Sequence, residues 1–524
     1  MGRFHLSISN NKRESFIPSV SKVSSATALS RVLGLVREQV MAYYFGAGMA
    51  TDAFVTAFRI PNILRDMFAE GALSQSFIPI FKKKLVSDTE KEAFNLASII
   101  ITFIFIVVGL IVILGVLAAP AIIYITANGF TADPEKFSLT VSLTRIMFFY
   151  LLTVSLAALV MGILNSFNRF GIPALSSSMF NLGMILSVIC LYNYLEVPIY
   201  AMAIGVIIGG LGQVFIQVPS LRKIGYKFKP VFNFLHEDFK KVMKLFMPMI
   251  IGLSASRVNI LISTLLASFL VEGSISYLSY SYRLMHFPMG VFAVALGTVA
   301  LPKISELVSN NDTESLSRSF AEAFNLNIFI LIPSGIFLAL FGKEIVQLIF
   351  QWGEFSYSAT DNTYLALLHY SYGLIGFGTV RVVVPFYYAF NDSKLPMKFS
   401  LITVLVNIIL YYPLIQVLNF AGLAAATSLA GLLNCILLIY FLPRKGIDIS
   451  FSKLWLYIFK IIIAASIAFY SAKMIPSFVS FENVILNRVA NLIIPGIEAL
   501  LIYILICFLL RIRELNKYLN YFKK

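Results

Sequence analysis

Charged side chains are scarce in this chain. Only 13% of its 524 residues are Asp, Glu, Lys or Arg, whereas 59% are hydrophobic. Soluble domains are about one quarter charged, so no soluble core could hide this much apolar surface. The mean hydropathy is +0.84, and apolar stretches long enough to cross a bilayer recur from end to end. The composition therefore predicts an all-α integral membrane protein.

Cysteine and catalytic motifs are also scarce. Cys190, Cys435 and Cys507 lie in separate apolar runs, so we expect neither disulfides nor thiolate metal sites. The sequence contains no Walker A loop, no cluster of metal ligands and no hydrolase nucleophile elbow. Its short loops leave no room for a soluble catalytic domain. We therefore expect a protein that is not an enzyme and that uses no metal or cofactor.

The N-terminal segment has no long apolar run. Residues 1–22 are polar, and charged residues interrupt residues 23–45. We therefore expect no cleavable signal peptide. Apolar runs farther along predict about fourteen spans, of which the first, second and eighth are weak by hydropathy. The spans are 24–46, 52–81, 93–124, 138–164, 172–193, 198–220, 240–268, 274–302, 320–342, 362–390, 397–416, 420–442, 455–474 and 485–510.

Basic residues gather in alternate loops. The net charge is +15, and the richest loops include 82–84, 222–229, 444–453 and the segment from 511. Cytoplasmic loops are rich in Lys and Arg, so the pattern predicts a multi-pass inner-membrane protein with both termini in the cytoplasm. We therefore interpret the basic residues as a sign of membrane topology and as groups that contact membrane lipids. We expect no nucleic-acid partner.

The chain looks duplicated. The segment FNRFGIP at 167–173 matches FNDSKLP at 390–396, and SRV at 30–32 matches SRV at 256–258. These matches keep their order and a nearly constant offset, which predicts two parallel six-helix halves, a common build of transporters. The expected domains are a cytoplasmic tail at 1–22, lobes at 23–230 and 231–443, and two further helices with a basic tail at 444–524.

Arginine is unusually common inside the spans. One at the bilayer centre costs about 2.5–3.5 kcal/mol, so each must meet water, an acid or the interface. Polar residues of the second span share one helical stripe, and Pro61 should kink the helix there. The arginines are Arg31, Arg37, Arg59, Arg65, Arg145, Arg257, Arg283 and Arg381; the stripe is Asp52, Arg59, Asn62, Asp66 and Glu70.

Two interpretations of these arginines remain open. They could form buried ion pairs, with Glu38, Asp52, Asp66 and Glu70 as partners. However, the first, second, seventh and eighth spans hold six arginines and only four clear acids. Surplus arginine suits an anion, because guanidinium binds phosphate or carboxylate through two hydrogen bonds. His286 on the eighth span reads as a hydrogen-bonded packing residue rather than a proton carrier.

Three segments resemble one known family. SRVLGLVREQVMAYYFGAGMATDAFVTAFRIPNILRDMFAEGALSQSFIPIF (30–81), LNSFNRFGIPA (164–174) and ASFLVEGSISYLSYSYRLMHFPMGVFAVALGTVALP (267–302) resemble the bacterial lipid II flippases, the MurJ (MviN) family. The resemblance implies two six-helix lobes in a V plus two helices whose groove holds a polyprenyl tail. It also implies a cargo, undecaprenyl-pyrophosphate carrying the disaccharide-pentapeptide of peptidoglycan. We expect this cargo to move to the periplasmic leaflet by alternating access.

The resemblance also assigns roles. It places the substrate-binding arginines at Arg31, Arg37, Arg65 and Arg283, with Arg59 as a further basic residue, and a gating acid at Asp52. In the transport scheme that we expect, Asp66, Glu70 and Glu38 form charge pairs that differ between the two states.

The sequence departs from the family in two places. Tyr282 stands where many relatives have an acid, and the seventh, eleventh and twelfth spans carry no carboxylate. A sodium site associated with those spans is therefore not expected to work here. The membrane potential acting on a cationic cavity is a fair substitute, at about 2.3 kcal/mol per charge per 100 mV.

Four alternatives stay open at this point. The nearest is an exporter of another polyprenyl-linked glycan. A drug exporter should carry acids in its cavity, and a membrane glycosyltransferase needs catalytic acids and a metal-binding loop. A scaffold for cell-wall synthesis proteins, which are conceivable partners, has no reason to bury arginines.

Overall fold

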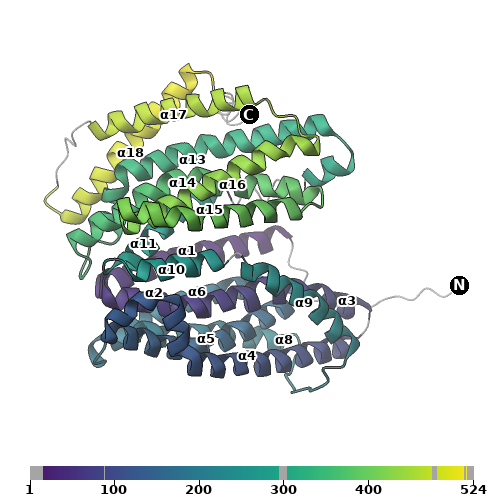
Figure 1. Cartoon of the computed structure of the whole chain (residues 1–524). Helices are drawn as coiled ribbons and strands as arrows, with labels where there is room; N and C mark the ends of the chain where they lie inside the picture. Colours follow the sequence, from purple (N-terminus) through teal and green to yellow (C-terminus); the bar gives the residue numbers. More distant parts are fainter. Residues whose placement is uncertain are drawn as a thin grey trace. The chain divides into compact units, whose positions relative to one another are not determined.

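The computed structural model describes residues 16–87, 89–255, 257–293, 302, 304–474, 481–512 and 515, and within these ranges it is helical without strands. The chain divides into two compact units. The first comprises residues 1–41 and 53–258, and the second comprises 42–52 and 259–524. Figure 1 shows long helices running side by side within each unit.

The first unit is built from helices that precede residue 258. Its core is formed by buried apolar residues of α3, α4, α5, α8 and α9, among them Phe77, Phe148 and Phe246. The elements are α1 Phe16–Phe45, α2 Met49–Arg65, η1 Asp66–Gly71, α3 Ala72–Ser87, α4 Glu90–Thr126, η2 Asn128–Ala132, α5 Pro134–Ser166, α6 Gly171–Leu191, η3 Tyr192–Tyr194, α7 Tyr200–Phe215, α8 Val218–Lys223 and α9 Glu237–Ala255.

The second unit contains the remaining helices and the short segment 42–52. Its core joins α13, α14 and α16 to the two C-terminal helices, which lie against α13 (Figure 1). The elements are α10 Val258–Ser268, α11 Ser274–Pro288, η4 Met289–Ala293, α13 Thr313–Ile349, α14 Tyr357–Ala389, α15 Lys394–Leu418, α16 Phe420–Phe441, η5 Leu442–Lys445, α17 Phe451–Met474 and α18 Val484–Leu509.

Ten described helices are long and apolar enough to cross a membrane, and they match ten of the expected spans. The other four expected spans are the first, second, seventh and eighth, which carry the clustered arginines. Three of these are irregular. The second contains the π-helical turn η1, the eighth runs into the π-helical turn η4, and the seventh divides into α9 and α10. Hydropathy did not predict that the seventh span would lack a single long apolar helix.

The outward faces of the ten spans are apolar. On α4, for example, Phe105, Leu110, Ile113 and Leu117 are more than half exposed. A soluble protein rarely exposes such a contiguous apolar surface. These side chains are therefore suited to contact lipid tails, as expected for an integral membrane protein.

The two matched FN segments adopt the same turn. Asn168 and Asn391 both have a left-handed φ, at 57° and 55°. Arg169 N–H donates to the Leu164 carbonyl, and Asp392 N–H donates to the Tyr387 carbonyl, each at 3.0 Å. This bond pattern closes a helix C-terminus, and Asn tolerates the left-handed position. The duplicated sequence thus forms a duplicated local structure.

The C-terminal helices are fixed to α13 by hydrogen bonds as well as apolar contact. Pro333 lies inside α13 and has no N–H, so the helix cannot satisfy the Phe329 carbonyl in the usual way. The Tyr503 hydroxyl of α18 donates to that carbonyl at 2.9 Å. Arg488 donates to the carbonyls of Gln347 and Gln351 at the end of α13, both at 2.9 Å. The last helix, α18, therefore satisfies backbone groups that α13 leaves open.

Candidate functional site

Arg37 of α1 is held by two side chains of the first unit. Its Nη2 lies 2.5 Å from the Glu38 carboxylate, and its Nη1 donates to Asn181 Oδ1 of α6 at 3.0 Å. The side chains of Arg37 and Glu38 are only 11% and 6% exposed. Asn181 also donates to the Ser30 carbonyl at 3.1 Å. The guanidinium is therefore fixed in direction, and one carboxylate offsets its charge.

Arg31 lies in the same helix but on a more open surface. It is exposed in the structure, whereas Arg37 is partly buried. The expected separation of the two arginines around α1 is consistent with this difference.

Asp66 is shared by two arginines. Its Oδ1 accepts from Arg65 Nη2 at 2.8 Å, and its Oδ2 lies 2.9 Å from Arg257 Nη2. Both arginines belong to the first unit. Arg257 Nε is buried and has no hydrogen-bond partner within the described part of the chain. Among the contacts described for it, this carboxylate therefore holds two guanidinium groups together.

The Arg65–Asp66 pair stands where α2 changes into the π-helical turn η1. Pro61 lies within α2, and the irregular geometry begins five residues later. Single π-turns inside helices occur frequently at functional sites. Arg59 is partly buried on the same helix, and the side chain of Glu70 lies outside the described residues.

Asp52 caps a helix that follows it by more than 200 residues. Its Oδ2 accepts from Gly273 N–H at 2.9 Å, and its Oδ1 accepts from the N–H and the hydroxyl of Ser276 at 2.9 and 2.6 Å. The carboxylate is 1% exposed. A carboxylate at a helix N-terminus satisfies free N–H groups and complements the helix dipole. Asp52 thus holds the N-terminus of α11.

The N-terminus of α2 is capped in return. Met49 N–H donates to Glu272 Oε1 at 2.8 Å, and Glu272 precedes α11. Gly46 has a φ of 60°, and its carbonyl accepts from the Tyr280 hydroxyl at 3.1 Å. The helices α2 and α11, which are equivalent in the two repeats, therefore exchange carboxylate caps. The capped ends of both helices belong to the second unit, because residues 42–52 are part of it.

Arg283 is exposed on α11 in the second unit. On the same helix, His286 Nδ1 lies 3.1 Å from the Tyr282 carbonyl, and the rings of Tyr282 and His286 are 3.9 Å apart. These contacts agree with the interpretation of His286 as a hydrogen-bonded packing residue. The structure places Arg283 and the arginines of α1 and α2 in different units, so their convergence on one anion stays a prediction.

Neutral groups link α10 and α15, which belong to two of the three spans for which a sodium site was not expected to work. Asn407 donates through Nδ2 to Asn259 Oδ1 and to the Tyr411 hydroxyl, each at 3.0 Å. The Tyr411 hydroxyl in turn donates to Asn259 Oδ1 at 3.2 Å. These described contacts join amides and a phenol and involve no charged group.

At a basic cluster near residue 84, α3 is joined to α9 by ion pairs. Lys84 Nζ lies 2.7 Å from Asp238 Oδ2, and Lys241 Nζ lies 2.8 Å from Oδ1. Hydrogen bonds from Lys241 and Lys84 lower the pKa of Asp238 to about 2. The carboxyl therefore stays charged at neutral pH and joins the two helices.

Comparison with known proteins identifies the family. The model of the lipid II flippase MurJ family matches residues 41–490. The chain belongs to this family. The probable lipid II flippase of Buchnera aphidicola subsp. Schizaphis graminum is 35% identical over 95% of this chain and 98% of its own. The lipid II flippase of Burkholderia cenocepacia is 33% identical over 81% of this chain and 83% of its own.

Solved structures agree with the family assignment. A lipid II flippase MurJ in an inward closed conformation superposes with a TM-score of 0.78, at 28% identity, and covers 93% of this chain and 98% of its own. A multidrug resistance MATE family transporter of the MOP superfamily gives a TM-score of 0.64 at 12% identity over 82% of this chain and 98% of its own. The latter match shows a shared fold alone.

Sequence reasoning missed several partners at these sites. Arg257 was recognised as an arginine of the spans, but its position beside Asp66 was not expected. Asn181 on α6, and Glu272 and Ser276 near α11, were not recognised. Their partners are more than 140 residues away in sequence, and periodicity carries no information on such contacts. The nearly constant sequence offset between the two repeats was the signal that could have predicted a contact between α2 and α11.

Proposed function

We propose that this chain carries lipid II, the undecaprenyl-pyrophosphate-linked disaccharide-pentapeptide, from the cytoplasmic to the periplasmic leaflet of the bacterial inner membrane. It would act as a transporter rather than an enzyme. The observation that carries the proposal is its membership of the lipid II flippase family over residues 41–490. The protein named lipid II flippase in Burkholderia cenocepacia is 33% identical, and ten spans support a multi-pass membrane protein.

The anion is proposed to bind to arginines of the polar helices, namely Arg31, Arg37, Arg59, Arg65 and Arg283. Support comes from the Asp66 cluster, in which two guanidinium groups share one carboxylate. Arg37 is pre-oriented by Glu38 and Asn181. Guanidinium groups suit pyrophosphate, because each can donate two hydrogen bonds to its oxygens.

The two lobes, taken as residues 23–230 and 231–443, are proposed to alternate between inward-open and outward-open states. The exchanged caps of α2 and α11 are suited to a gate, because they can only form when the two N-termini meet. Asp52 would stabilise one state, while Asp66, Glu38 and Glu70 change partners between states. A ligand shifts such an equilibrium only if it binds one state more tightly than the other. Both termini are proposed to lie in the cytoplasm, on the strength of the Lys- and Arg-rich alternate loops.

The test is replacement of the resident flippase in a bacterium. Lipid II on the periplasmic face is counted with a membrane-impermeant probe after depletion of that flippase. We expect the wild-type chain to restore exposure and the Arg37→Ala, Arg283→Ala variant to lose most of it. Arg318→Ala is the matched control, since Arg318 is exposed on α13 and pairs only with Glu314 among the contacts described for it.

The outcomes separate the cargo from the site. A correctly inserted wild-type chain that restores no exposure would contradict the cargo, and an exporter of another polyprenyl-linked glycan would then be favoured. Full exposure in the double variant would contradict the arginine site while leaving the cargo intact.

A further inference from the structure

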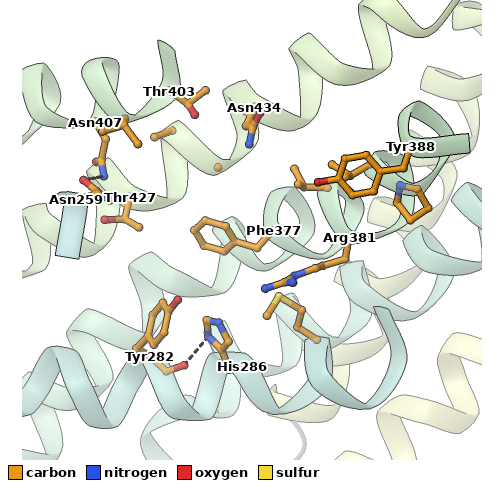
Figure 2. Close-up of a pocket in the computed structure, with 17 residues that line it drawn as sticks. Asn259, Tyr282, His286, Phe377, Arg381, Tyr388, Thr403, Asn407, Thr427 and Asn434 are labelled. Carbon is orange, nitrogen blue, oxygen red and sulfur yellow. Dashed lines mark hydrogen bonds between the residues drawn. The ribbon is translucent and has the colours of Figure 1, made fainter. Parts of the chain in front are cut away.

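A cavity of about 650 Å³ lies inside the second unit. Its walls come from α10, α11, η4, α14, α15 and α16 (Figure 2). Cavities of this size commonly hold small ligands. None of the proposed pyrophosphate-binding arginines lines it.

Arg381 is the charged residue of this cavity. It stands on α14 in line with Phe377, Val384 and Tyr388, at helical spacings that place all four on one face. Figure 2 shows its guanidinium extending into the space toward which Tyr282 and His286 also point. The lining contains no carboxylate, and within the described part of the chain Arg381 has no ion-pair partner. An arginine in a membrane-spanning helix needs water or an anion, and the cavity is the place for one.

The opposite walls carry amides and hydroxyls. Thr403 and Asn407 come from α15, and Thr427 and Asn434 come from α16. The Oδ1 atoms of Asn407 and Asn434 are buried and have no hydrogen-bond partner within the described residues. Unsatisfied buried acceptors in a native structure call for a ligand or ordered water. Amide side chains both donate and accept, which matches the backbone of a peptide.

We propose that this cavity binds the peptide portion of the cargo and that Arg381 pairs with a carboxylate of that peptide. The inference rests on the proposed function, because lipid II carries a pentapeptide with a free C-terminal carboxylate. The amides and hydroxyls of α15 and α16 bind the peptide groups, and Phe377, Val380 and Val384 contact its apolar side chains. The cargo is thus held at two places, its pyrophosphate by the polar helices and its peptide inside the second unit.

The charge of the site favours a carboxylate over a phosphate group. One guanidinium matches the single charge of a carboxylate, and no second Lys or Arg lines the cavity. A pyrophosphate carries at least two charges and is better matched by the clustered arginines of α1 and α2.

The experiment compares two soluble, short-chain analogues of lipid II, one with the pentapeptide and one with the disaccharide alone. Dissociation constants are measured for the purified full-length protein in phosphatidylcholine nanodiscs. We expect Arg381→Gln to weaken binding of the peptide analogue about ten- to hundredfold, the range for loss of a charged hydrogen bond. Binding of the disaccharide analogue should not change. Arg145→Gln, which removes an exposed arginine from α5, is the matched control and should change neither.

Each other outcome overturns a stated part of the proposal. Equal weakening of both analogues would assign Arg381 to the pyrophosphate, and no weakening would exclude the cavity as a peptide site. If phosphatidylglycerol competes with the peptide analogue on the wild type but not on Arg381→Gln, Arg381 binds a lipid phosphate instead. A wild-type protein that binds neither analogue contradicts the proposed function itself.

Discussion

Removal of the Tyr503 hydroxyl should destabilise the protein, because Pro333 leaves a carbonyl of α13 that only this hydroxyl is described as satisfying. Tyr503→Phe keeps the ring, which is 2% exposed, but leaves the Phe329 carbonyl without its donor. A buried acceptor that loses its partner costs about 1–3 kcal/mol, and no water in the bilayer core can replace it. We therefore expect the apparent Tm of the purified protein to fall by roughly 1–3 °C, because a chain of 524 residues has a large unfolding entropy.

A second substitution isolates the cause. Pro333→Ala returns an N–H that can satisfy the Phe329 carbonyl within the helix, so Tyr503→Phe should cost less in that background. The difference between the two costs is the coupling energy of a double-mutant cycle. Intrinsic fluorescence during heating measures the unfolding, and Tyr470→Phe is the control because Tyr470 is 55% exposed on α17.

The result that would refute this reasoning is additivity. If Tyr503→Phe costs the same with and without Pro333, its hydroxyl does not act through the carbonyl that the proline leaves open. The stabilising contact would then lie elsewhere in the packing of α18.

Three further predictions concern the proposed gate, the ion pair between Lys84 and Asp238, and the close contacts between helices. Asp52→Asn should loosen the cap on α11. A Thr51→Cys reporter in a Cys190→Ser background, at a fully buried position, should then react faster with an impermeant thiol reagent. An unchanged reaction rate would count against the gate. The lowered pKa of Asp238 means that its pairing with Lys84 stabilises the fold above pH 4 and is lost as the pH falls toward 2. A double-mutant cycle on the pair should give about 0.2–1 kcal/mol, falling with added salt. Gly183→Val should destabilise the protein by about 1–3 kcal/mol in thermal unfolding, because a Cβ there would lie 2.5 Å from the backbone of Gly209. The control is Gly109→Val on α4, which should not destabilise the protein because nothing lies within 4 Å of a Cβ there.

Hydropathy predicted the ten regular spans because each contains a long, mainly apolar stretch. It predicted the four spans with clustered arginines less well, for a physical reason. The polar side chains that make them useful lower their hydropathy, and π-turns and a break shift their periodicity. The kink expected at Pro61 illustrates this: the irregular turn begins at Asp66, where the Arg65–Asp66 pair stands.

The candidate site was predictable in its residue types but not in its partners. An arginine in a span must be explained, and this drew attention to Arg37 and Arg65. The choice of partner depends on contacts between distant segments, as between Arg37 and Asn181 or Asp52 and Ser276. Such contacts need the fold, because local spacing places residues only within one helix.

The two π-helical turns also bear on side-chain register. They begin at Asp66 and Met289, and the same 223-residue offset separates Asn168 from Asn391. A π-turn holds one residue more per hydrogen-bonded loop than an α-turn. In the second span, the residues of α3 that follow η1 therefore face other directions than a continuous α-helix would give them. Deleting one residue of η1 to restore an unbroken α-helix would rotate that whole segment about its axis.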